Sequence, residues 1–145
     1  MPKINESELK KEIKSGDFKN AYLLYGEESY LKEYYASELK NKIVDKTFEA
    51  FNFHYFDGKD TELDDILKDA QMLPMMSEYN FVMVKDYPIE KSANDIKLLE
   101  EYLKDAPDTT VFVLWFDAIE PDVKSAKFKH SAESVVKPLD KNRVL

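Results

Sequence analysis

The chain contains no cysteine, which excludes disulfide bonds and metal sites built on thiolates and fits a reducing cytoplasm. It has only 3 glycines, so there is little room for a glycine-rich phosphate loop. No apolar run approaches the roughly 20 residues of a membrane span. Residues 1–6 also lack the long apolar core of a signal peptide. We therefore expect a cytoplasmic protein that makes no membrane contact.

A broad basic surface is also missing. The formal net charge is −8 at pH 7, which argues against a domain that grips nucleic acid directly. Apolar residues make up 43% of the chain and charged residues 34%, an ordinary balance for a globular protein. At 145 residues the chain is long enough to bury a real core. We expect one domain over residues 1–138, and at 139–145 the start of a linker to a second domain.

Apolar runs that predict strands alternate with amphipathic stretches that predict helices. This alternation predicts an α/β fold of three layers, with helices on both faces of a parallel sheet. A long helix is expected at 29–43, with Tyr30 and Tyr34 in its inward stripe. The five expected strands are residues 22–25, 51–56, 81–85, 111–116 and 134–137.

The first strand–turn–helix unit is where an α/β protein would bind a nucleotide. A phosphate loop needs Gly, four residues, Gly-Lys, and then Ser or Thr. The chain reads Gly26-Glu27-Glu28-Ser29-Tyr30-Leu31-Lys32-Glu33. Leu31 would crowd the phosphates, and Glu27 and Glu28 would repel them. Lys32 alone matches the motif, and a lysine on an exposed helical face is common, so we expect no nucleotide to bind here.

No other set of residues predicts a catalytic or metal site. Asp117 ends an apolar strand, as a magnesium-binding aspartate would, but Ala118 follows it and no glutamate is there to activate water. A turn or cap role is the better interpretation of Asp117. His54 lies in an aromatic strand and His130 lies among lysines, with no metal-ligand spacing around either. We predict no catalytic residue, no metal and no cofactor.

The most unusual stretch is residues 71–85. Its second half is an apolar strand, and its first half is a connection that is apolar as well, although loops normally run over the surface. The residues that give the connection this character are Leu73, Pro74, Met75 and Met76. Their side chains either fold back under the strand as core or stay exposed as an adaptable contact for a partner. The pattern leaves both possibilities open.

Three segments follow one another in a recognisable order. The first, a strand followed by Gly-x-[Glu/Asp] and a helix, is Tyr22-Leu23-Leu24-Tyr25-Gly26-Glu27-Glu28-Ser29-Tyr30-Leu31. The second is Met72-Leu73-Pro74-Met75-Met76-Ser77-Glu78-Tyr79-Asn80-Phe81-Val82-Met83-Val84-Lys85. The third is Val135-Val136-Lys137-Pro138-Leu139. Together they resemble the N-terminal domain of the delta subunit of bacterial DNA polymerase III, a clamp-loader subunit.

The resemblance implies an AAA+-like fold without ATPase activity, which agrees with the missing phosphate-loop features after Gly26. It also implies that the two apolar residues after Leu73-Pro74, by position Met75 and Met76, insert into a hydrophobic pocket on the sliding clamp. The family often has bulkier residues there and a basic residue at the position of Tyr79. The implied function is to promote opening of the clamp during DNA replication. Other loader subunits would handle ATP.

The partners that the resemblance implies are the sliding clamp (the beta subunit) and the other loader subunits, gamma/tau and delta prime. DNA would be contacted only through the full complex. Two further hypotheses stay open at this stage. A divergent nucleotide hydrolase would use Lys32 and Asp117, and nucleotide-dependent stabilisation would support it. A scaffold that contacts only loader subunits would keep Met75 and Met76 buried.

Overall fold

The computed structural model describes residues 6–25, 29–89 and 92–119. Within these residues the helices are α1 (Glu6–Ser15), α2 (Ser29–Ile43), α3 (Glu49–Asn52), α4 (Leu63–Ala70) and α5 (Ala93–Lys104), and a 3-10 turn covers Lys46–Phe48. The strands are β1 (Ala21–Leu24), β2 (Phe53–Asp57), β3 (Asn80–Lys85) and β4 (Thr110–Trp115). They form a four-stranded sheet in the order β1-β4-β3-β2. Every neighbouring pair is parallel, as the sequence predicted.

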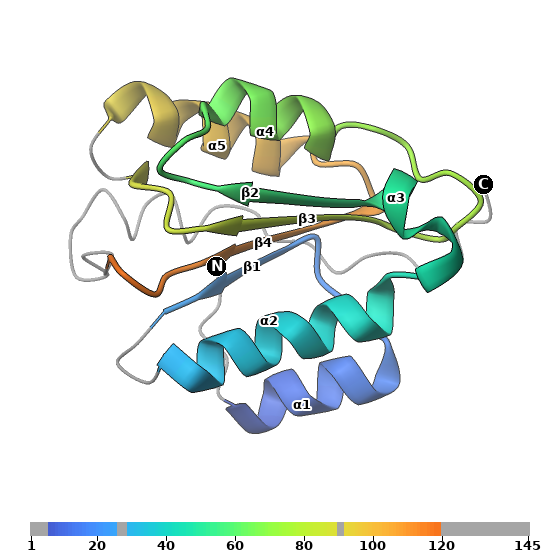
Figure 1. Cartoon of the computed structure of the whole chain (residues 1–145). Helices are drawn as coiled ribbons and strands as arrows, with labels where there is room; N and C mark the ends of the chain where they lie inside the picture. Colours follow the sequence, from blue (N-terminus) through green and yellow to red (C-terminus); the bar gives the residue numbers. More distant parts are fainter. Residues whose placement is uncertain (1–5, 26–28, 90–91, 120–145) are drawn as a thin grey trace.

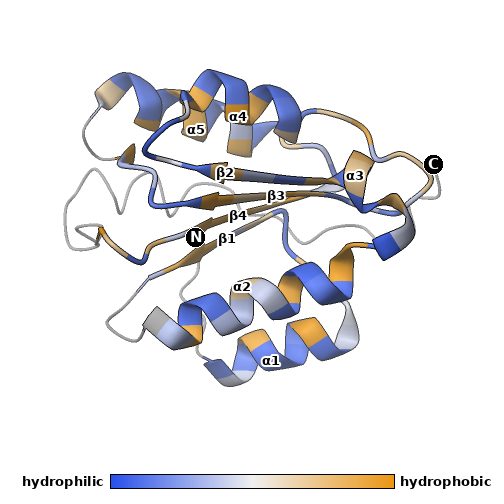
Figure 2. Cartoon of the chain, viewed as in Figure 1, coloured by the Kyte–Doolittle hydropathy of each residue, from blue (hydrophilic) through white to orange (hydrophobic). Residues whose placement is uncertain are grey.

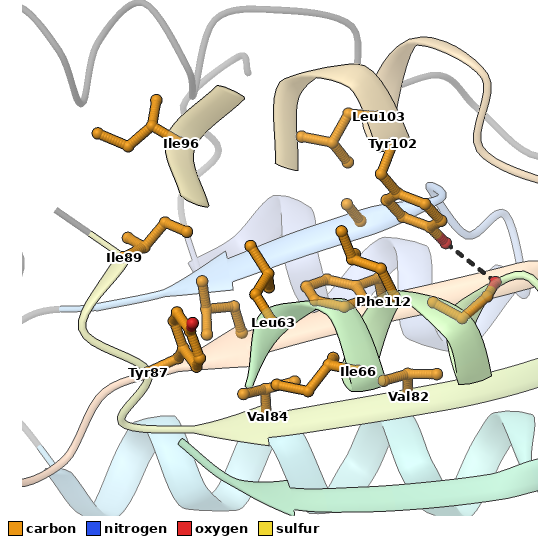
Figure 3. Packing of buried hydrophobic residues seen from close by; sticks show 14 of the residues in the cluster. Leu63, Ile66, Val82, Val84, Tyr87, Ile89, Ile96, Tyr102, Leu103 and Phe112 are labelled. Carbon is orange, nitrogen blue, oxygen red and sulfur yellow. Dashed lines mark hydrogen bonds between the residues drawn. The ribbon is translucent and has the colours of Figure 1, made fainter. Parts of the chain in front are cut away.

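The sheet lies between two helical layers, with α1 and α2 on one face and α4 and α5 on the other (Figure 1). The central strands are buried on both faces because their sequences are continuously apolar. Along β3, Phe81 and Met83 pack on the side of α2. Val82 and Val84 pack on the opposite side, in the core under α4 and α5 (Figure 3). Because successive side chains alternate between the two faces, each face of the sheet has its own core.

Two predictions about local structure were wrong. Residues 51 and 52 do not begin a strand, because they complete the one-turn helix α3 and β2 begins at Phe53. Tyr30 and Tyr34 do not face the core, since they are 73% and 50% exposed. The inward stripe of α2 is Leu31, Tyr35, Leu39 and Ile43, which are spaced by one helical turn. Tyr30 and Tyr34 each lie one position before that stripe and so point elsewhere.

The expected fifth strand at 134–137 lies outside the described residues, and so does the expected domain boundary between 138 and 139. Both stay predictions. The four strands that were predicted within the described part are present, and β3 covers the predicted residues 81–85.

Asp86 ties the carboxyl ends of the two central strands together. It follows β3, is 2% exposed, and has a positive φ of 55°. Its carboxylate accepts hydrogen bonds from the backbone N–H groups of Asp117, Ala118 and Ile119, at 2.7, 3.1 and 3.3 Å. Burial alone would raise the pKa of Asp86, but these N–H groups and Lys85 outweigh burial and lower the pKa below its ordinary value.

We expect Asp86→Asn to lower the free energy of unfolding at pH 7 by about 1–3 kcal/mol, because the acceptor loses its charge and a donor NH2 group replaces one of its two oxygens. Asparagine tolerates the positive φ, so the backbone is not strained. Because the folded-state pKa is depressed, the stabilisation is complete above the ordinary pKa of 3.8 and is lost as the pH falls through the folded-state pKa. Urea unfolding of both proteins at pH 7 and at low pH measures this. A difference in stability that does not shrink in acid would contradict the assignment.

Candidate protein-binding loop

The apolar connection, residues 71–79, joins α4 to β3 and therefore lies at the amino end of β3 (Figure 1). Its apolar side chains point to solvent: Met72 is 48% exposed, Leu73 72%, Met75 52% and Met76 77%. Figure 2 shows apolar residues along this loop away from the sheet. The possibility that Met75 and Met76 are core residues is therefore wrong. Apolar side chains gathered in one exposed loop are typical of a surface that binds another molecule.

A buried asparagine beneath the loop fixes its backbone. Asn52, the last residue of α3, is 1% exposed. Its side-chain Nδ2 donates to the Met75 carbonyl at 2.7 Å, and its Oδ1 accepts from the Met75 N–H at 2.6 Å. Both backbone groups of Met75 are thus satisfied from below. The Met75 side chain is left to face solvent.

Two further buried side chains hold the beginning of the loop. The side-chain Nδ2 of Asn80, 1% exposed at the start of β3, donates to the carbonyls of Asp69 and Met72 at 2.9 and 3.2 Å. The Tyr102 hydroxyl of α5 donates to the Ala70 carbonyl at 3.2 Å (Figure 3). Burial raises the pKa of Tyr102, so this donor stays protonated. The backbone is therefore anchored at the start of the loop and at Met75, although the apolar side chains of the loop are exposed.

Met76 has a φ of 56°, in the left-handed region that non-glycine residues rarely adopt. It is also the most exposed of the loop's apolar side chains, at 77%. A strained backbone costs folding free energy, and an exposed apolar side chain contributes little in return. Strain of this kind gathers at functional sites. The loop therefore has a geometry that folding stability alone does not favour.

The described part of the phosphate-loop position, residues 29–33, begins α2 and follows β1, at the opposite end of the parallel strands from the apolar loop. Gly26, Glu27 and Glu28 are outside the described residues. Leu31, which stands where the motif requires its second glycine, packs against the core under α2. Lys32 is 5% exposed, so the interpretation of Lys32 as a lysine on an exposed face is wrong.

The other residues considered for chemistry do not come together. His54 Nδ1 lies 3.4 Å from Asp69 Oδ2 on α4, and its side chain is 14% exposed, as a packed histidine would be. Asp117 is exposed, and its Oδ2 lies 3.7 Å from Lys85 Nζ. His130 lies outside the described residues. Among the residues that the structure describes, no three or more acidic or histidine side chains are arranged to hold a metal ion.

Asn52 and Asn80 position the loop, and the sequence pattern indicates neither role. Asn52 was assigned to a strand because aromatic residues surround it. Asparagine is depleted in strands, so its place inside an aromatic run was a signal that the strand starts later. No signal in the sequence connects Asn52 to Met75, which lies 23 residues further along the chain.

A family model described as DNA polymerase III, delta subunit, matches residues 22–144. The DNA polymerase III subunit delta of Bacillus subtilis is 33% identical over 111 residues, which are 72% of this chain and 32% of that protein. The solved Bacillus subtilis DNA clamp loader delta protein matches with a TM-score of 0.75 at 29% identity, covering 89% of this chain and 40% of that chain. The chain therefore belongs to the DNA polymerase III delta subunit family. Within the described residues, no helix has the length and apolar character that a membrane span requires.

We expect Asn52→Ala to lower the free energy of unfolding by about 1–2 kcal/mol, because the two backbone groups of Met75 lose their partner. The Met75 amide should then exchange its hydrogen faster, while amides in the middle of β3 exchange as in the wild type. Asn41→Ala is the matched control, since Asn41 is an exposed asparagine of α2. An unchanged exchange rate at Met75 would mean that Asn52 does not hold the loop.

Proposed function

We propose that this chain binds the sliding clamp of DNA replication through the loop at residues 71–79, with Leu73, Pro74, Met75 and Met76 as the contact. The observation that carries the proposal is that the apolar side chains of this loop are exposed while buried Asn52 holds its backbone. Membership of the delta subunit family supports it, as does the likeness to a protein named as a DNA clamp loader delta protein.

The proposed mechanism is differential binding. A loop that fits a strained or open clamp interface better than the closed one shifts the ring toward opening by the difference between the two binding free energies. Burial of two methionine side chains supplies on the order of 3–5 kcal/mol before ordering costs. The loop backbone is already held by Asn52 and Asn80, so the ordering cost falls mainly on the side chains.

In this proposal the chain hydrolyses no ATP. The packing of Leu31 against the core supports this, because a phosphate loop needs an uncrowded backbone at that position. ATP hydrolysis is then the task of the gamma/tau subunits, and delta prime and DNA are contacted within the full loader. The AAA+-like character of the fold is part of the same proposal, and the likeness to the solved clamp loader delta protein supports it.

The nucleotide hydrolase stays a rival with its own test. If it were correct, ATP with magnesium would raise the melting temperature of the chain, and a Lys32→Ala variant would lose that rise. The scaffold hypothesis required Met75 and Met76 to be buried, and their exposure of 52% and 77% removes that support.

The double variant Met75→Ala/Met76→Ala should bind the clamp at least tenfold more weakly than the wild type, a loss of about 1.4 kcal/mol or more. Calorimetric titration of the chain into its own sliding clamp measures this. The fold of the double variant should be unchanged, because both side chains are exposed. Equal binding by the two proteins would place the clamp contact elsewhere.

Met76→Gly separates binding from stability. Glycine adopts a φ of 56° without strain, so we expect the free energy of unfolding to stay within about 1 kcal/mol of the wild type or to rise. Clamp binding should weaken because the side chain is gone. Unfolding curves and calorimetry on the same sample compare the two effects. A clearly less stable variant would show that the Met76 side chain supports the fold and is not primarily a contact.

A further inference from the structure

Phe51 is a large apolar residue that is not part of the proposed clamp contact. It lies in α3 and is 55% exposed. Single exposed apolar residues are normal on protein surfaces and need no explanation by themselves. Phe51 differs because the next residue, Asn52, makes the two hydrogen bonds to the Met75 backbone. Consecutive Cα atoms are about 3.8 Å apart, so the Cα atom of Phe51 lies next to that of Asn52, the residue that holds the loop backbone.

The short helix that carries Phe51 is held on two sides. On one side, Asn52 joins it to Met75. On the other, Glu49 Oε1 lies 2.7 Å from the Nζ atom of Lys40 in α2. Lys40 Nζ also lies over the ring of Phe53, 4.2 Å from its centroid. A one-turn helix has little stability of its own, so these contacts determine where Phe51 is presented.

We infer that Phe51 is a second apolar anchor on the same docking surface as Met75 and Met76, and that the sliding clamp covers it. This inference rests on the proposed function. We infer the sliding clamp as the occupant because Asn52 fixes α3 and the loop relative to each other, so a partner seated on the loop lies beside the helix that carries Phe51 (Figure 1). Phe51 adds what the two methionines lack, a rigid side chain that loses little rotamer freedom on binding.

The test is calorimetric binding of this chain to its sliding clamp for a set of variants. Phe51→Ala should weaken binding by about tenfold, as removal of an aromatic anchor does. Phe51→Gln, which keeps helix propensity and removes the apolar ring, should show the same loss. Phe51→Leu, which keeps an apolar side chain, should restore most of the affinity. Tyr30→Ala is the matched control and should bind as the wild type, because Tyr30 is an exposed aromatic residue at the start of α2, at the opposite end of the strands from the loop.

The outcomes separate this inference from the proposed function. If Met75→Ala/Met76→Ala weakens binding and the Phe51 variants bind as the wild type, the inference fails and the proposed function stands. If the wild-type chain does not bind the clamp at all, both fail. If Phe51→Ala abolishes a concentration-dependent dimer of this chain and leaves clamp binding unchanged, the occupant is a second copy, and the inference is again overturned. Circular dichroism of every variant establishes that the losses are not losses of fold.

Discussion

The arrangement of the candidate site depends on one pair of hydrogen bonds, between the side-chain amide of Asn52 and the backbone of Met75. A buried amide must find partners for its donor and its acceptor, and Asn52 finds both on a single residue of the loop. The loop backbone is thereby satisfied from the protein side. The apolar side chains of the loop point outward to solvent. The same pair of bonds joins α3 to the loop, so that Phe51 and Met75 belong to one structural unit.

The parallel sheet separates the apolar loop from the start of α2. Because every strand runs in the same direction, the loop before β3 lies at the amino ends of the strands, and the start of α2, which follows β1, lies at their carboxyl ends. Between them lies a core that is closely packed on both faces, including Phe81 and Val82, each 0% exposed. Such a base transmits force without deforming locally. In the proposed function, this is how a movement imposed elsewhere in the loader would reach a clamp bound at the loop.

The sequence predicted those elements that its local pattern determines. The strand β3 was predicted because Phe81 to Val84 form a continuous apolar run, and the parallel sheet followed from the alternation of strands and helices. The one-turn helix α3 was missed because Phe51 and Asn52 precede an aromatic strand without a break in composition. The sequence pattern does not determine the exposure of Met75 and Met76, because the loop backbone is held by Asn52, far away in the sequence. Local patterns indicate which face of a helix or strand is apolar, but they do not indicate that a single buried asparagine holds a distant loop.

The central claim is that the methionines of the loop, and not those of the core, meet the clamp. The chain has 5 methionines, so their methyl groups give a sparse NMR spectrum when labelled with carbon-13. On addition of the sliding clamp, the Met75 and Met76 methyl signals should shift or broaden. Met83, which is 6% exposed within β3, should keep its position and serve as the internal control. If the clamp binds while the Met75 and Met76 signals stay unchanged, the contact lies elsewhere and the account is wrong.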